Sequence, residues 1–171
     1  MSFNYSKITY KDALKIGSDD APVKVVEYVN LRCPFSKKYE ENVVPSLDQY
    51  IKDGKVQRVL KHFDKEKYPL EVGNVLNQYL DYNHPEETYE RIQKIFAKQD
   101  IWGNQRLSHI PHVAKEYGLT LQENNKEQAD RIFEEVQAVN VELIPTIFVG
   151  EKEWIGTVEL DEFLEEIEKS L

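Results

Sequence analysis

The single cysteine of this 171-residue chain, Cys33, stands in the segment Leu31–Lys38, which reads LRCPFSKK. A cysteine that acts as a nucleophile must reach the thiolate state, because the thiolate and not the thiol attacks. Here a proline follows the cysteine, a serine stands three positions on, and basic residues lie on both sides. We interpret this pattern as a reactive thiol rather than a small, inert, buried side chain.

The elements around Cys33 explain why its sulfur would be reactive. The preceding segment, Ala21–Leu31, is rich in valine and reads as a buried strand. Apolar residues then recur at helical spacing up to Gly54, a typical helix stop. Pro34 would take the first helical position, where a missing N–H costs nothing. We therefore expect Cys33 at or beside the helix N-cap, where free amides and the helix dipole stabilise a thiolate.

The rest of the chain continues as alternating strands and helices. Pro45 should kink the helix after Cys33, and Lys55–Phe63 reads as a second strand, parallel to the first. Four helical patterns fill residues 68–139, and two short antiparallel strands are expected at 146–149 and 153–156. The last helix is amphipathic, with one apolar face formed by Leu160, Phe163, Leu164 and Ile167. One sheet with an inserted helical segment is therefore predicted.

Composition excludes several classes of function. The net charge of −9 is uneven: residues 1–68 hold 13 Lys and Arg against 10 Asp and Glu, and residues 69–171 hold 9 against 21. No basic cluster is present to neutralise phosphates, and no stretch approaches the about 20 apolar residues of a membrane helix, so neither nucleic acid nor a membrane is expected as a partner. The N-terminus lacks a signal-peptide pattern, which predicts a cytoplasmic protein. His109 and His112 have no nearby cysteine, so no metal site is expected.

Two segments of the chain resemble the DsbA-type thioredoxin-fold proteins. Val25–Phe63 is similar to the N-terminal part of that family, and Leu143–Ile167 (LIPTIFVGEKEWIGTVELDEFLEEI) is similar to its C-terminal part. The resemblance implies an α/β thioredoxin fold, with a central mixed sheet flanked by helices and an inserted all-helical subdomain. It also implies a single domain over all 171 residues, with the core at about 20–66 and 139–171 and the insertion at about 67–138.

The resemblance also assigns roles to individual residues. Cys33 matches the nucleophilic first cysteine of the family's Cys-Pro-x-Cys motif, and Pro34 matches its proline. Pro145 matches the proline that is cis in this fold and packs beside the active sulfur. Ile144 occupies the position whose backbone binds an incoming peptide or thiol. Glu27, six residues before Cys33, matches a buried acid that assists proton transfer.

Ser36 is the position at which the chain departs from the motif. A serine cannot resolve a mixed disulfide, because that step needs a second thiolate. Its hydroxyl can instead donate a hydrogen bond to the Cys33 thiolate. Phe35 replaces the histidine of many oxidising relatives, and Phe35 and Trp102 are expected to flank a groove over Cys33.

Three functions fit these residues. The first is a cytoplasmic monothiol thiol-disulfide oxidoreductase, in which Cys33 attacks a disulfide and an external thiol resolves the mixed disulfide. The second is a transferase similar to the kappa-class glutathione transferases, in which Ser36 or the helix amides stabilise a bound cofactor thiolate. The third is a redox-inactive peptide-binding or chaperone-like module. The expected partners are protein or small-molecule thiols and disulfides, with a low-molecular-weight thiol as co-substrate, no resident cofactor, and a monomeric or homodimeric state.

Overall fold

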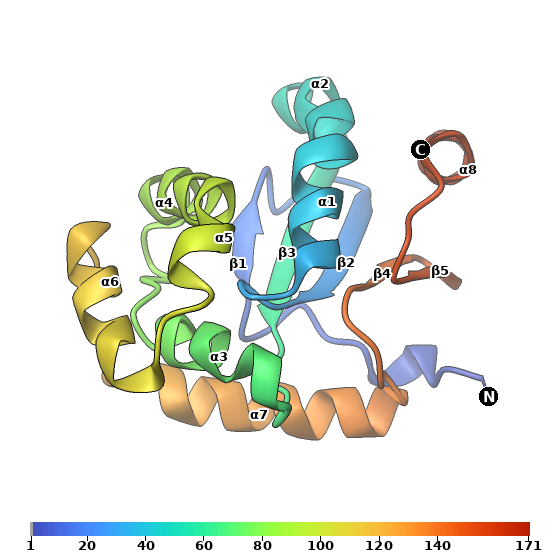
Figure 1. Cartoon of the computed structure of the whole chain (residues 1–171). Helices are drawn as coiled ribbons and strands as arrows, with labels where there is room; N and C mark the ends of the chain where they lie inside the picture. Colours follow the sequence, from blue (N-terminus) through green and yellow to red (C-terminus); the bar gives the residue numbers. More distant parts are fainter. Residues whose placement is uncertain (1) are drawn as a thin grey trace.

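The computed structural model describes residues 2–171 and has one mixed five-stranded sheet in the order β1-β3-β2-β4-β5 (Figure 1). Strands β2 and β3 run parallel, and the other neighbouring pairs are antiparallel. The strands are β1 (Leu14–Ile16), β2 (Val23–Val29), β3 (Val56–His62), β4 (Thr146–Val149) and β5 (Lys152–Ile155). The four strands expected from the sequence are confirmed, and the edge strand β1 is an addition.

The central strands β2 and β3 are buried on both faces. All of β3 is buried, and in β2 only Lys24 is partly exposed. This burial agrees with their valine-rich sequences, because a parallel pair covered on both faces reads as a nearly continuous apolar run. Three residues whose side chains are ordinarily charged at neutral pH are nevertheless buried in the two strands, namely Glu27, Arg58 and Lys61. Each of them needs a partner within the core.

The helix after Cys33 is interrupted at Pro45, as the sequence predicts. It consists of α1 (Pro34–Asn42), a 3-10 turn (Val44–Leu47) and α2 (Asp48–Lys52). Proline provides no N–H for an α-helical bond, and the α-helical pattern gives way to a 3-10 turn at this position. Apolar side chains of this segment pack with those of α8 (Leu160–Ser170) on one face of the sheet. Trp154 of β5 belongs to the same cluster and is 5% exposed.

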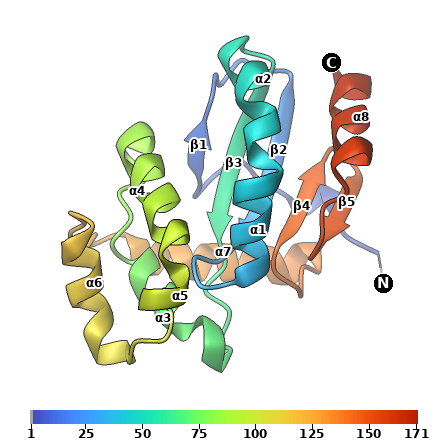
Figure 2. The same ribbon diagram turned by 45° about the horizontal axis from the view of Figure 1, so that its top comes forward.

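Four helices pack beside the β1 edge of the sheet (Figures 1 and 2). They are α3 (Glu71–Asn77), α4 (Pro85–Ala97), α5 (Gln99–Trp102) and α6 (Ile110–Glu116). Helix α5 was not expected as a separate helix, and α3 ends earlier than its sequence pattern suggests. Their shared apolar cluster includes Trp102 and also Leu14, Leu31 and Leu60. These helices therefore pack directly against the sheet and the loop before Cys33.

Helix α7 (Asn125–Val139) covers the face of the sheet opposite to α1 and α8 (Figure 1). Its apolar residues share a cluster with Val26 and Tyr28 of β2 and Phe148 of β4. The region expected as an insertion, residues 67–138, thus includes a helix that packs on the sheet itself. Within residues 2–171, every helix is too short or too polar to cross a membrane.

Candidate functional site

Cys33 lies at the junction of strand and helix that the sequence predicts. It is the N-cap of α1, and Pro34 is the first helical residue. The Cys33 N–H donates to the Asn30 carbonyl at 3.1 Å, and the Cys33 carbonyl accepts from the Lys37 N–H, also at 3.1 Å. The side chain of Cys33 therefore leaves the backbone beside the N-terminal amides of α1, which is the positive end of the helix dipole.

The Cys33 thiol points toward the loop before β4. Its side chain is 6% exposed, and Sγ donates to the Ile144 carbonyl at 3.6 Å. Within the described residues, the sulfur forms no capping hydrogen bond with α1, in contrast to the expected contact with free amides. The physical reason is that a protonated thiol is a donor and takes the carbonyl as its acceptor.

The loop before β4 brings two of the expected residues to Cys33. The Ile144–Pro145 peptide bond is cis, and the Pro145 carbonyl accepts from the Gly156 N–H at 2.8 Å. Ile144 is half-buried, whereas its neighbour Leu143 is 57% exposed. Segments 111 residues apart in the sequence therefore meet at the sulfur.

Ser36 lies in the first turn of α1 and contacts the end of β2. Its side chain is 1% exposed, and its Oγ accepts a hydrogen bond from the Asn30 N–H at 3.3 Å. The hydroxyl thus joins the first turn of α1 to the end of β2. A hydroxyl that accepts still has its own proton to donate. Donation to a Cys33 thiolate therefore stays an expectation that this contact does not prevent.

The two aromatic residues expected to flank the sulfur have different environments. Phe35 is 50% exposed, and Lys38 Nζ lies 5.2 Å from the centre of its ring. Trp102 is 3% exposed, and its indole N–H donates to the Ile95 carbonyl at 2.7 Å. Its ring fills the core of the helical region, so the prediction that Trp102 lines a groove is wrong. Phe35 and the neighbouring Pro34 are both exposed.

Gln99 of α5 is a site residue that sequence reasoning missed. Its Nε2 donates to the Leu31 carbonyl at 2.7 Å and to the Cys33 carbonyl at 3.1 Å. The side chain is 1% exposed. No motif marks this glutamine, because it stands 66 residues after Cys33 and reaches it only through the packing of α5.

The loop just before Cys33, residues 30–32, is held to the helical region by two further side chains. Asn30 Nδ2 donates to Asn74 Oδ1 at 2.7 Å, and Arg32 Nε donates to the Gly103 carbonyl at 3.0 Å. Glycines permit this close approach: a Cβ on Gly73 would lie 2.2 Å from Asn30 Oδ1, and one on Gly103 would lie 2.6 Å from Arg32 Nε. The backbone before Cys33 is therefore fixed from the helical side.

Glu27 lies in a buried charge cluster under α1. Its carboxylate forms a bidentate ion pair with Arg58, in which Nε and Nη2 each lie 2.8 Å from a carboxylate oxygen. Arg58 Nη2 also donates to Glu40 Oε1 at 2.9 Å. The Tyr89 hydroxyl donates to Glu40. Burial raises the pKa of Glu27, while Arg58 opposes that rise. The acid that the resemblance assigned to proton transfer thus uses Arg58 as its hydrogen-bond partner, and a proton on Glu27 is favoured by its burial.

The histidine pair considered for metal binding lies on the surface away from this site. The rings of His109 and His112 are 4.9 Å apart, and His112 pairs with Glu116 at 3.1 Å. In residues 2–171, no three His, Cys, Asp or Glu side chains are arranged to hold a metal ion.

Comparison with known proteins agrees with this geometry. The family model described as Thioredoxin matches residues 9–169. The disulfide bond formation protein D of Bacillus subtilis (strain 168) is 27% identical over 168 residues, which cover 91% of this chain and 76% of that protein.

Solved structures give the same result for the fold. A conserved protein of unknown function from Enterococcus faecalis V583 is 37% identical, with a TM-score of 0.92 over 97% of this chain and 95% of that chain. Oxidised BdbD from Bacillus subtilis is 22% identical, with a TM-score of 0.75 over 95% of this chain and 94% of that chain. The similarity therefore includes the sheet, the helices beside it and α8.

Proposed function

Because this chain belongs to the thioredoxin family, we propose that it is a thiol-disulfide oxidoreductase that works through a single cysteine. The observation that carries the proposal is the position of Cys33 at the N-terminus of α1, with its sulfur against the Ile144 carbonyl. The B. subtilis relative, named a disulfide bond formation protein, supports the same class of reaction.

The reaction consists of two exchanges. The Cys33 thiolate attacks one sulfur of a substrate disulfide, the S–S bond breaks, and the other sulfur leaves as a thiolate. An external thiolate then attacks the substrate sulfur of the mixed disulfide and releases the Cys33 thiolate. The net result is that the external thiol replaces one thiol of the substrate disulfide, that thiol is released, and the protein ends in its starting redox state.

The residues around Cys33 have separate tasks in this scheme. The Ile144 carbonyl holds the thiol while it is protonated. Once the proton leaves, the carbonyl no longer has a donor, and the amides of the first turn of α1 become the favourable neighbours of the sulfur. The Ser36 hydroxyl can donate to the same anion. Exposed Phe35 and Leu143 provide apolar surface for the groups attached to the disulfide.

The second thiol must come from outside the chain, because Cys33 is the only cysteine. A protein thiol or a low-molecular-weight thiol co-substrate fits this role, and no resident cofactor is needed. A reducing compartment maintains such thiols, so we place the proposed reaction in the cytoplasm. Oligomerisation is not required, and either a monomer or a homodimer fits.

A second candidate is a peptide-binding module without redox turnover. The exposed apolar side chains of Phe35 and Leu143 favour it, together with the serine in place of a second cysteine. In that case the loop around Ile144 would bind peptides, and Cys33 would be a buried thiol.

The two functions are separated by the reaction of the reduced protein with glutathione disulfide. We expect intact-mass analysis to show one glutathione on Cys33, formed faster than on free cysteine, and none on Cys33→Ala. Excess reduced glutathione should remove it. An adduct that forms no faster than on free cysteine would favour the peptide-binding module.

Substitutions of Ser36 test the proposed chemistry at that position. Ser36→Ala should slow formation of the adduct, because one donor to the anion is lost. Ser36→Cys should shorten the life of the mixed disulfide, since it supplies a resolving thiol. Unchanged adduct formation and lifetime in both variants would exclude a role for position 36 in the exchange.

A further inference from the structure

The side chain of Gln99 connects the helical region to the reactive cysteine. We propose that Gln99 is the positioning residue of Cys33. It holds the backbone of the cysteine so that the sulfur faces the Ile144 carbonyl in the loop before β4. This inference rests on the proposed function, because it names the group that tunes the same reaction.

The hydrogen bonds of Gln99 explain this role. Both of its contacts, 2.7 Å to the Leu31 carbonyl and 3.1 Å to the Cys33 carbonyl, are made by the single nitrogen Nε2. A primary amide has two N–H groups, so each carbonyl can receive one. These carbonyls stand on the two sides of Arg32, and together they fix the direction in which the chain enters α1.

The burial of Gln99 makes these bonds effective. At 1% exposure no solvent competes for its amide, and a buried amide is unfavourable unless it is hydrogen-bonded. The neighbour Trp102 and the rest of the apolar cluster hold α5 in place. The backbone at Cys33 is therefore extended (φ −68°, ψ 120°) between a fixed amide on one side and the first turn of α1 on the other.

Gln57 provides a matched control in the same molecule. It is 2% exposed, and its Nε2 donates to Asp19 Oδ1 at 2.7 Å and to the Gly17 carbonyl at 3.4 Å. It therefore also joins a buried amide to a loop. That loop precedes β2, whereas Cys33 follows the other end of this strand.

The test compares Gln99→Met with Gln57→Met. For each variant we would measure the free energy of unfolding and, under conditions where the protein is fully folded, the second-order rate constant of Cys33 with glutathione disulfide. Both variants should lose stability, but only Gln99→Met should slow the reaction, by roughly tenfold or more, because small displacements of a reacting group have large effects on rate. Equal rates for wild type and Gln99→Met would overturn the proposal.

A glutamate at the same position adds a pH readout that general destabilisation would not produce. An ionised carboxylate has no donor for the Leu31 and Cys33 carbonyls, whereas a protonated one has a single O–H. The rate of Gln99→Glu relative to wild type should therefore rise as the pH falls. The relative rate of Gln57→Glu should stay constant. A flat ratio for Gln99→Glu would contradict the positioning role.

Failure of the proposed function would be seen separately. If wild-type Cys33 reacts no faster than free cysteine, the oxidoreductase is refuted. The inference is then judged by hydrogen exchange at two backbone amides. The Cys33 N–H donates to the Asn30 carbonyl, and the Lys37 N–H donates to the Cys33 carbonyl. Loss of their protection in Gln99→Met but not in Gln57→Met supports positioning, and unchanged protection overturns it.

Discussion

The two faces of the sheet each contain a buried cation from β3, and the partners of the two cations differ. Arg58 lies under α1 and α4, and Lys61 lies under α7, because residues an odd number of positions apart in a strand face opposite sides. Both are almost completely buried, at 1% and 0% exposure. Arg58 contacts two carboxylates, whereas Lys61 contacts one, that of Glu135.

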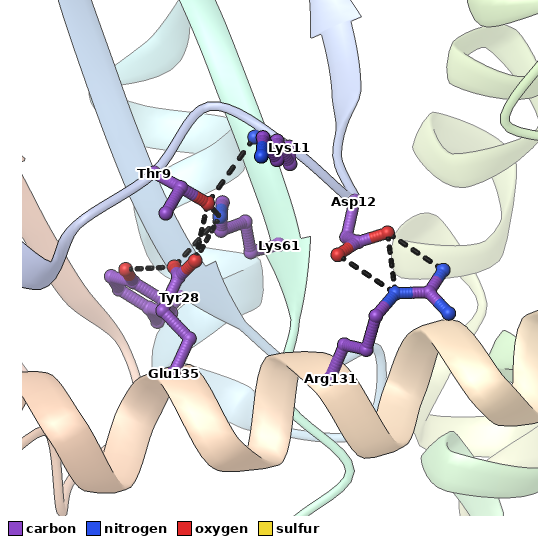
Figure 3. A network of polar contacts seen from close by, with 7 residues as sticks. All are labelled: Thr9, Lys11, Asp12, Tyr28, Lys61, Arg131 and Glu135. Carbon is purple, nitrogen blue, oxygen red and sulfur yellow. Dashed lines mark hydrogen bonds and ion pairs between the residues drawn. The ribbon is translucent and has the colours of Figure 1, made fainter.

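Figure 3 shows how the Lys61 cluster fastens the N-terminal segment to α7. Lys61 Nζ lies 2.8 and 2.7 Å from the two carboxylate oxygens of Glu135 and 2.9 Å from Thr9 Oγ1. The Tyr28 hydroxyl donates to the same carboxylate. This cluster pairs one lysine with one carboxylate, and its contacts join the N-terminal segment, β2, β3 and α7.

The cluster under α1 is balanced only when one carboxyl holds a proton. Two acids and one guanidinium carry a net negative charge if both acids ionise, and burial raises the pKa of Glu27. The comparison teaches that the face below Cys33 has two acids for one cation, where burial favours the protonated form of Glu27, whereas the α7 face has one acid for one cation.

The largest effect is expected for Arg58→Met. Removing the cation leaves Glu27 and Glu40 without their shared ion-pair partner, and only Glu40 keeps a donor, Tyr89, which should lower the free energy of unfolding by about 3–5 kcal/mol at neutral pH. Denaturant titration measures this loss. Arg58→Lys keeps the charge but not the bidentate geometry, so its free energy of unfolding should fall by less. A loss for Arg58→Met no greater than that for Lys61→Met would break the comparison.

A smaller effect is expected for Lys61→Met, about 1–3 kcal/mol. Glu135 keeps the Tyr28 donor, and its side chain is 11% exposed, so water can reach the carboxylate. Adding Glu135→Gln should recover part of the loss in the double variant, because no unpaired charge then remains. Full additivity of the two single losses in the same titration would show that the pair does not act as a unit.

The smallest effect is a pH dependence at Glu27. Its folded pKa is above the ordinary value of 4.5, so as the pH rises the unfolded chain releases this proton first and the wild type loses stability. The variant Glu27→Gln has no titratable group at this position, so its stability does not change with pH for this reason. The free energy of unfolding of the variant minus that of the wild type should therefore increase as the pH rises above 4.5. A difference that is constant, or that falls with pH, would show that Arg58 outweighs burial.

Local signals were sufficient to predict the junction at Cys33. The valine-rich strand, Pro34 at the first helical position and the break at Pro45 each depend on a few adjacent residues. Strand β1 was missed because three residues are too few to show a period.

The partners of the site could not be predicted because they depend on tertiary packing. Glu27 and Arg58 come together through the register of β2 and β3. In this register Val25 pairs with Arg58 and Glu27 pairs with Leu60, so Glu27 and Arg58 belong to adjacent pairs on the same face of the sheet. Trp102 was expected beside the sulfur but is buried in the helical region, and Gln99 of the same short helix takes the place near Cys33.

The placement of the two tryptophans has a spectroscopic consequence. Trp102 lies in the apolar cluster of the helices beside β1, and Trp154 lies in the cluster between the sheet and α8. The chain has no other tryptophan. Tryptophan fluorescence of Trp154→Phe therefore monitors the helices beside β1, and that of Trp102→Phe monitors the packing between the sheet and α8. Coincident denaturation curves from the two emitters would mean that both regions melt as one cooperative unit.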